Sequence, residues 1–505
     1  MILDGRTLTP EAVEAVARGG EQVELAAEAR ERNAAAARAL DELVAGGERV
    51  YGVTTGVGPF RTDPVPEDQR GDQQLRLLRS HASGGGRELP PELVRAAMVV
   101  RANQIGAGGA GVSEGLLDAL VDALNAGVTP VAHEIGSLGT GDLTVLAEIA
   151  LALIERSDPA LGSHDGLGFM SSNAASIGHA ALVAVAAGRL LDAALEVAAL
   201  SFLGADADRV VLDERVQQAR PHPGQTAVAA RLRELLAADA GARRASESAP
   251  GEADAPVQDP FPFRALPQVE GTARDALTAL ERVLAVELNA AAENPLIASG
   301  EPAILPNANF HAGALALALD GLRGALAQSS SLCAARVTAM LEPDLTGLPP
   351  MLASDAGPGS GAMMLEYTVH AAAAGVRALA APVANQTTVV GSGVESHASF
   401  APLAARMAEE ALDSAAVAIA TELVVAMRAL RMRKLEPAGS PAAELYTRAA
   451  AVLDADLEDR PLAEDVEAAR RLVKGTTPAS SRRAAGDSAS PPSSGRASAC
   501  PSCRT

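Results

Sequence analysis

Apolar residues recur every three or four positions along most of the chain, which is the spacing of amphipathic helices. This pattern predicts helices over eight stretches: 10–34, 91–127, 143–156, 174–203, 272–293, 310–341, 362–380 and 401–432. Strand-like alternation is scarce. We therefore expect a mainly α fold with a long central helical bundle, because such helices bury their apolar faces against one another.

Two of these stretches carry further signals. Thr9 is expected to cap the first helix, with Pro10 as its first residue and Glu11 at its positive end. The stretch 174–203 is apolar enough to suggest a membrane span, but Arg189, Asp192 and Glu196 interrupt it. We interpret it as a buried helix of the bundle.

The chain divides into three regions on this pattern. Residues 1–200 form an N-terminal region with glycine-rich loops, and residues 201–475 form the bundle core. Residues 476–505 are rich in Ser, Pro, Gly and Arg, and are expected to be a disordered tail. Residues 238–256 are polar and small, and are expected to be a surface loop.

The charge and the cysteine content of the chain exclude some classes of function. The net charge of −21 over 505 residues argues against binding to nucleic acid or to an anionic membrane surface. No charged-then-apolar leader opens the chain. The three cysteines, Cys333, Cys500 and Cys503, cannot form a disulfide framework, so we expect a reducing, cytoplasmic location.

Candidate chemistry lies in the loops between apolar helices. Tyr51 is a candidate base or a buried tyrosine with a satisfied hydroxyl, and Arg264 is a candidate carboxylate ligand or a structural ion pair. Glu395 and His397 form an acid–base pair or a solvated turn, and His81 is a substrate contact or a structural histidine. No histidine spacing predicts a metal site, and no glycine loop has the lysine of a P-loop.

The order of the loop motifs resembles the histidine ammonia-lyase and aromatic amino acid lyase family. The resemblance runs from about residue 3 to about residue 473. It rests on the motifs YGVTTGVG, LLRSHASGGG, RPHPGQTAVAARL, VQDPFPFRALPQVEG, NANFHAG and ESHASFAP. It implies a fold like that of the ammonia-lyases and fumarases, a homotetramer whose sites are each built from three chains, and no external cofactor.

In typical members an Ala-Ser-Gly run cyclises and dehydrates to a methylidene-imidazolone, an electrophile at the start of a helix. The family pattern G-S-x-G-A-S-G-D-L stands here as G-S-L-G-T-G-D-L, one residue shorter. One placement of the gap leaves no tripeptide, and the other sets Gly139, Thr140 and Gly141 over Ala-Ser-Gly. The second placement permits an ethylidene-imidazolone, but we expect an unmodified loop.

The resemblance assigns the remaining site residues. Tyr51 matches the proposed base and Arg264 the carboxylate-binding arginine. Ser171 takes the position of an asparagine that orients the electrophile, and Phe261 that of a nearby tyrosine. Three more positions match residues that line the substrate pocket: Gln258, Asn309 and Phe310. His81 and Glu395 match positions that meet an imidazole in histidine-type members.

Three functions remain open on these residues. The first is a carbon–nitrogen lyase of this family that acts on a small polar, histidine-like α-amino acid with an altered or absent electrophile. The second is conventional deamination of histidine to urocanate. The third is a non-catalytic homologue that binds an amino acid.

Overall fold

The computed structural model describes residues 1–237, 258–354 and 359–475. Its helices of eight or more residues are α1 (Pro10–Ala17), α2 (Ala27–Ala45), α3 (Arg70–His81), α4 (Pro91–Ala107), α5 (Glu114–Asn125), α6 (Leu143–Ser157), α8 (Ala174–Ala205), α10 (Pro223–Leu235), α12 (Leu266–Glu287), α13 (Gly313–Met340), α15 (Met363–Leu379), α16 (Ala401–Arg433), α17 (Ala442–Ala450) and α18 (Ala463–Val473). The shorter helices are α7 (Asp165–Met170), α9 (Glu214–Gln218), α11 (Phe261–Arg264) and α14 (Pro343–Thr346).

The strands are few and short, and each pairs with one other strand. Parallel β1 (Ile2–Leu3) and β2 (Glu24–Leu25), antiparallel β3 (Gly85–Glu88) and β4 (His133–Ile135), and antiparallel β5 (Leu296–Ala298) and β6 (Ala303–Leu305) make three two-stranded sheets. The mainly α fold predicted from the periodicity is confirmed.

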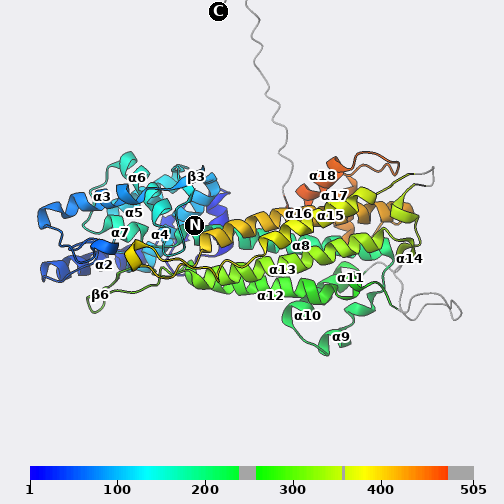
Figure 1. Cartoon of the computed structure of the whole chain (residues 1–505), viewed down its shortest axis with the longest axis horizontal. Coiled ribbons are helices and arrows are strands. Elements are labelled where there is room, and N and C mark those ends of the chain that lie inside the picture. The colour runs from blue at the N-terminus through cyan, green and yellow to red at the C-terminus, as the bar shows by residue number, and fades with distance from the viewer. Residues whose placement is uncertain (238–257, 355–358, 476–505) are drawn as a thin grey trace, which may run out of the picture.

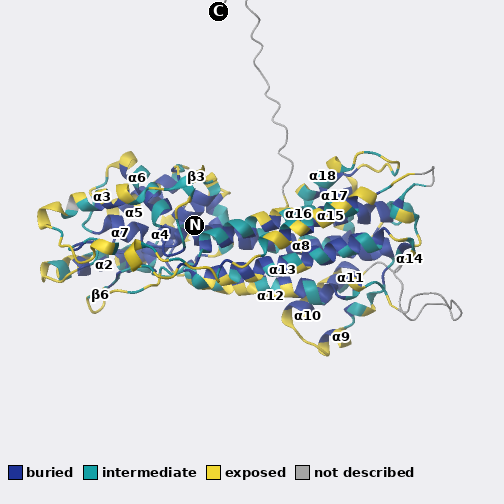
Figure 2. Cartoon of the chain, in the orientation of Figure 1, coloured by how far each residue is buried: buried dark blue, intermediate teal, exposed yellow. Residues whose placement is uncertain are grey.

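A bundle of long helices forms one part of the molecule, and α1 to α7 form the other (Figure 1). The bundle is made by α8, α12, α13, α15 and α16, and α8 and α13 both pack along α16. Small residues allow this close packing: Gly204 of α8 lies against Ala426 and Ala429 of α16. The buried residues follow the inner faces of these helices along the bundle axis (Figure 2).

The predicted helices are correct in kind, but two of them are divided. The stretch 10–34 is two helices separated by β2, and 91–127 is two helices separated at Gly108. Gly20 and Gly108 have φ of 69° and 95°, a backbone conformation that ends a helix and that glycine adopts at little cost. Thr9 caps α1 as predicted, because its side chain accepts a hydrogen bond from the Ala12 amide.

The expected boundary at residue 200 falls inside α8, which begins the bundle at Ala174. The N-terminal region also receives later segments of the chain: β5 and β6 pack against α2. The expected tail, 476–505, and the expected loop, 238–256, lie outside the described residues. Within the described ranges, no helix has the length and apolar character needed to cross a membrane.

Candidate active site

Two glycines with positive φ shape the loop that precedes α6. Gly139 and Gly141 have φ of 80° and 99°, which side chains rarely allow. Thr140 lies between them and forms an isolated antiparallel β-bridge with His311. Asp142 follows, and its amide donates to the Ser172 carbonyl at 2.6 Å. The loop is therefore pinned between two segments distant in sequence.

Each residue of this loop has its own hydrogen-bond partner. The Ser399 hydroxyl donates to the Gly139 carbonyl at 2.9 Å. The Gly141 amide donates to Asn173 Oδ1 at 3.1 Å. Thr140 Oγ1 donates to Glu395 Oε2 at 2.7 Å. The Thr140 hydroxyl is thus placed at a carboxylate that comes from a loop 255 residues later.

A cavity of about 660 Å³ opens in front of Thr140. Its walls come from the segment 51–65, from α3, from the 140–143 loop and from the loop before α16. The lining includes Tyr51, Phe60, Asp63, Arg76, His81, Thr140, Gly141, Ser171, Asn294, Phe310 and Glu395. This volume is in the range of small-molecule sites.

Tyr51 is the candidate base of this cavity. Its hydroxyl oxygen accepts a hydrogen bond from the Gly58 amide at 2.8 Å. Burial raises the pKa of Tyr51, and the negative charge of Glu395 raises it further, while the Gly58 amide and Arg61 lower it. Burial and Glu395 therefore disfavour the phenolate, although the Gly58 amide is in place to stabilise one.

His81 closes the cavity at the end of α3. Its Nδ1 lies 2.8 Å from the Leu77 carbonyl oxygen, which can only accept, so Nδ1 carries a proton. Nε2 is then the acceptor of the neutral ring. This tautomer suits the recognition of an N–H group such as that of an imidazole ring.

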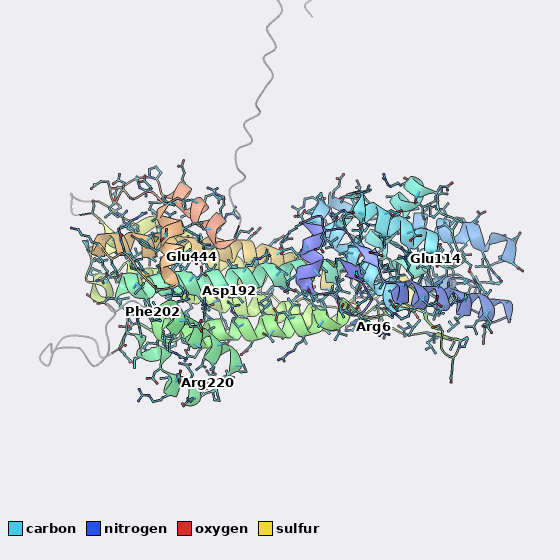
Figure 3. The ribbon with its side chains drawn as sticks, turned by 180° about the vertical axis from the view of Figure 1, so that it is seen from behind. Arg6, Glu114, Asp192, Phe202, Arg220 and Glu444 are labelled. Carbon is cyan, nitrogen blue, oxygen red and sulfur yellow. The ribbon has the colours of Figure 1, made fainter. Side chains whose placement is uncertain are left out.

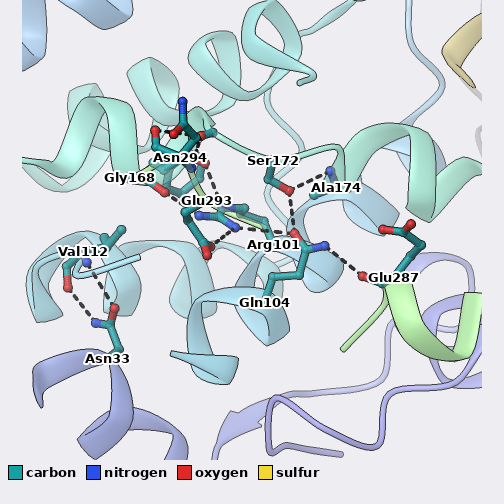
Figure 4. Close-up of polar contacts among 12 residues, drawn as sticks. Asn33, Arg101, Gln104, Val112, Gly168, Ser172, Ala174, Glu287, Glu293 and Asn294 are labelled. Atoms are coloured by element: carbon teal, nitrogen blue, oxygen red, sulfur yellow. Dashed lines mark hydrogen bonds and ion pairs between the residues drawn. The ribbon is translucent and has the colours of Figure 1, made fainter. Parts of the chain in front are cut away.

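A buried polar network supports the floor of the site (Figure 4). Arg101 of α4 donates to Glu293 Oε1 at 2.9 Å, and both side chains are fully buried. Ser172 donates to Gln104 Oε1 at 2.5 Å. The Asn294 amide donates to the Ser171 hydroxyl at 3.0 Å. The last two bonds hold Ser172 to α4 and Ser171 to the segment after Glu293, beneath the loop.

The structure brings together most of the predicted site residues. Tyr51, His81, Thr140, Gly141, Ser171, Phe310 and Glu395 line the cavity. Gly139 belongs to the same loop but is not part of the lining, and it lies against Ser399. Asn309 is exposed next to Phe310.

Three predicted residues do not reach this cavity within the chain. Gln258 is exposed just before α11, and Phe261 and Arg264 belong to α11. The Arg264 Nε donates to the Asp259 carbonyl, and its guanidinium lies over the Phe261 ring. Phe263 of the same helix packs on Phe202, which lies at the end of the bundle remote from α5 (Figure 3). From that position, Arg264 is not placed to bind a substrate carboxylate beside Thr140 of the same chain.

Two contacts of the loop differ from the expectation. Ser171 does not contact the loop through the bonds found for it, because its hydroxyl bonds the backbone of Asn294. Asn173, two residues further along the chain, bonds the Gly141 amide and the Phe310 carbonyl instead. The shortened loop sets Gly141 against Asn173, and only the folded loop shows this pairing.

Asp142 and Ser399 are further residues that the sequence did not single out. The Asp142 carboxylate accepts from the Ser176 amide at 2.7 Å and from its hydroxyl at 2.9 Å. Burial raises the pKa of Asp142 to about 6. Ser399 lies within the ESHASFAP motif, which was the available signal for it.

Known proteins resemble this chain over almost its whole length. The family model for aromatic amino acid lyases matches residues 8–159 and 157–451. Histidine ammonia-lyase from Anaeromyxobacter sp. strain K is 35% identical, with 94% of this chain and 98% of the relative covered. Histidine ammonia-lyase from Caldanaerobacter subterraneus is 32% identical, with 94% and 96% covered.

Solved structures of other proteins have a similar fold. Tyrosine aminomutase from Streptomyces globisporus matches with a TM-score of 0.88 at 26% identity, covering 94% of this chain and 97% of that one. The ergothioneine-degrading enzyme ergothionase from Treponema denticola matches with a TM-score of 0.86 at 28% identity, covering 94% and 98%. The predicted family is therefore confirmed: the chain belongs to the aromatic amino acid lyases, and it is a carbon–nitrogen lyase with the ammonia-lyase fold.

Proposed function

We propose that this protein eliminates the α-nitrogen of histidine or a closely similar imidazole amino acid, with Tyr51 as the base and with Thr140 unmodified. The observation that carries the proposal is the hydrogen bond from Thr140 Oγ1 to Glu395 in a cavity that also holds Tyr51 and His81. The relatives named histidine ammonia-lyase support the substrate class.

The loop does not fit the imidazolone of typical members. Cyclisation would join the Gly141 nitrogen to the Gly139 carbonyl carbon, yet these groups are bonded to Asn173 and Ser399 respectively. A Cβ at position 139, as in Ala-Ser-Gly, would lie 2.0 Å from Ser399 Oγ. Such a contact is far inside van der Waals separation, so the folded loop suits glycine and not the family's alanine.

The residues that line the cavity can take the separate roles that an elimination needs. Tyr51, as phenolate, takes a proton from the β-carbon, and the Gly58 amide stabilises the phenolate oxygen. The electrons of the C–H bond form the double bond to the α-carbon, and the C–N bond breaks. Glu395, held at Thr140, faces the cationic nitrogen before it leaves, and the Nε2 of His81 accepts from the substrate's ring.

We further propose that the active assembly is a homotetramer in which α11 of one chain completes the cavity of another. The position of Arg264 supports this arrangement, since α11 lies at the end of the bundle away from α3 and α7 (Figure 1). The resemblance to lyases with shared sites supports it as well. Light scattering of the purified protein tests the assembly, and a monomer would overturn it.

Intact mass and a peptide map across residues 136–142 test the unmodified loop. The expected mass is that of the printed sequence, and a loss of two waters at residues 139–141 would overturn the proposal. Turnover is then assayed with histidine, by urocanate absorbance, and with ergothioneine, which a structural relative degrades. Tyr51→Phe is the matched control: binding without turnover is expected, and unchanged turnover would remove Tyr51 from the mechanism.

A further inference from the structure

Aromatic residues are scarce in this protein but gather at the cavity. The chain has 7 phenylalanines, 3 tyrosines and no tryptophan among 505 residues. Three of these ten aromatic side chains, Tyr51, Phe60 and Phe310, line the one cavity in front of Thr140. Phe169, Phe202 and Phe263 are fully buried in the core, whereas these three side chains are exposed or half-buried, so their clustering points to a ligand.

The three aromatic residues are tied to the segment that carries Glu395. The Tyr51 hydroxyl bonds the Gly58 amide, at the start of the short turn Gly58–Phe60. This turn packs against the turn Gly391–Gly393, which leads to Glu395. Phe310 is next to His311, the bridge partner of Thr140, and Thr140 bonds Glu395.

The charges of the lining are divided between elements. The cationic side chain, Arg76, and the imidazole of His81 both belong to α3. The carboxylates, Asp63 and Glu395, belong to the two segments that carry Tyr51, Phe60 and the 391–393 turn. The cationic group of a zwitterion can therefore contact the acidic and aromatic side chains, on elements separate from the basic side chains of α3.

Phe60 is the least expected member of this set. Its side chain is 63% exposed although it lines the cavity. Aromatic faces around a carboxylate attract a cation through the ring quadrupole, and they suit a quaternary ammonium group because that group needs no hydrogen-bond acceptor.

We propose that the preferred substrate is a betaine, an imidazole amino acid whose α-nitrogen is fully alkylated, held by Tyr51, Phe60, Phe310 and Glu395. The inference rests on the proposed function and names its substrate class. It also explains how an amine can leave from a site that has no electrophile. A base strong enough to take a β-proton removes an N–H proton from a primary ammonium first, whereas a quaternary nitrogen has none to lose.

The step balances without any co-reactant. Tyr51 phenolate takes the β-proton, the C–H electron pair becomes the α,β double bond, and the C–N electron pair leaves with a neutral tertiary amine. The fixed positive charge of the substrate also opposes the effect of Glu395 on Tyr51. Burial and Glu395 raise the pKa of Tyr51, so a bound cation beside Glu395 favours the phenolate when it is needed.

The test compares histidine with its N,N,N-trimethyl betaine as probes of the full-length oligomer. Calorimetry measures the dissociation constant of each, urocanate absorbance follows elimination, and mass spectrometry detects trimethylamine or ammonia. The expected result is tighter binding and faster elimination with the betaine. Deamination of histidine with no turnover of the betaine would overturn this inference while leaving the proposed lyase in place. Failure of both probes to bind would instead overturn the proposed function.

Phe60 variants test the aromatic contact itself. Phe60→Leu keeps an apolar side chain but removes the ring, and is expected to weaken betaine binding by roughly 2- to 30-fold, with histidine binding changed less. Phe60→Trp, which keeps a ring, is the matched control and should retain betaine binding. Because Phe60 is exposed, neither change disturbs the core. Equal effects of Phe60→Leu on both probes would refute the aromatic recognition.

Discussion

Gly139→Ala is the most direct perturbation of the loop before α6. The added Cβ would lie 2.0 Å from Ser399 Oγ and 3.0 Å from the Ala401 nitrogen, on a residue with φ of 80°. The backbone conformation costs about 1–2 kcal/mol for an L-residue. Overpacking adds about 1–3 kcal/mol, so the variant should lose roughly 2–5 kcal/mol of unfolding free energy.

Urea unfolding followed by circular dichroism measures this loss, at one fixed protein concentration because the family is oligomeric. Gly127→Ala is the matched control, since Gly127 has φ of 68° and nothing within 4 Å of an added Cβ. It should show the cost of the backbone conformation alone.

Ser399→Ala removes the atom that the new Cβ would meet. Combined with Gly139→Ala, it should cost less than the sum of the single changes, because the closest contact is gone. The reasoning fails if Gly139→Ala costs no more than Gly127→Ala, or if the two changes at 139 and 399 are additive. The double substitution Gly139→Ala with Thr140→Ser writes Ala-Ser-Gly into the loop, and we expect it to strain the loop without producing a mass loss.

Three further predictions follow from the site. Glu395→Gln removes a charge that raises the pKa of Tyr51, so the rise of kcat/KM toward alkaline pH should move to lower pH; a pH–rate profile with an unmoved limb would contradict this. Burial raises the pKa of Asp142 from 3.8 to about 6, so the folded state holds the proton of Asp142 more tightly than the unfolded state does. The free energy of unfolding should therefore be highest below pH 3.8 and should fall by roughly 3 kcal/mol as the pH rises through 6. Asp142→Asn should remove that pH dependence from urea midpoints, and an unchanged dependence would refute the assignment. If α11 completes a neighbour's cavity, unfolding and refolding a mixture of inactive Tyr51→Phe and Arg264→Ala chains should restore part of the activity, whereas a mixture as inactive as its components would argue against shared sites.

The sequence by itself determined the class of fold and the family. Apolar periodicity is a local property, so it located the long helices α8, α13, α15 and α16 to within a few residues at most ends. Capping is local as well, and Thr9 was identified for that reason. The loop motifs named Tyr51 and Glu395, which lie in short runs typical of the family, and Thr140, which lies where the run departs from the family pattern.

Tertiary structure alone decided what these residues contact. Glu395 reaches Thr140 across 255 positions, and Asn173 rather than Ser171 bonds the shortened loop, because the bundle sets the relative positions of segments that share no local pattern. The resemblance placed Tyr51 and Phe310 in one pocket, but only the fold shows that Phe60 lines the same cavity. The space at Gly139 is defined by Ser399, a neighbour in the fold and not in the chain, so only packing decides that the loop suits glycine.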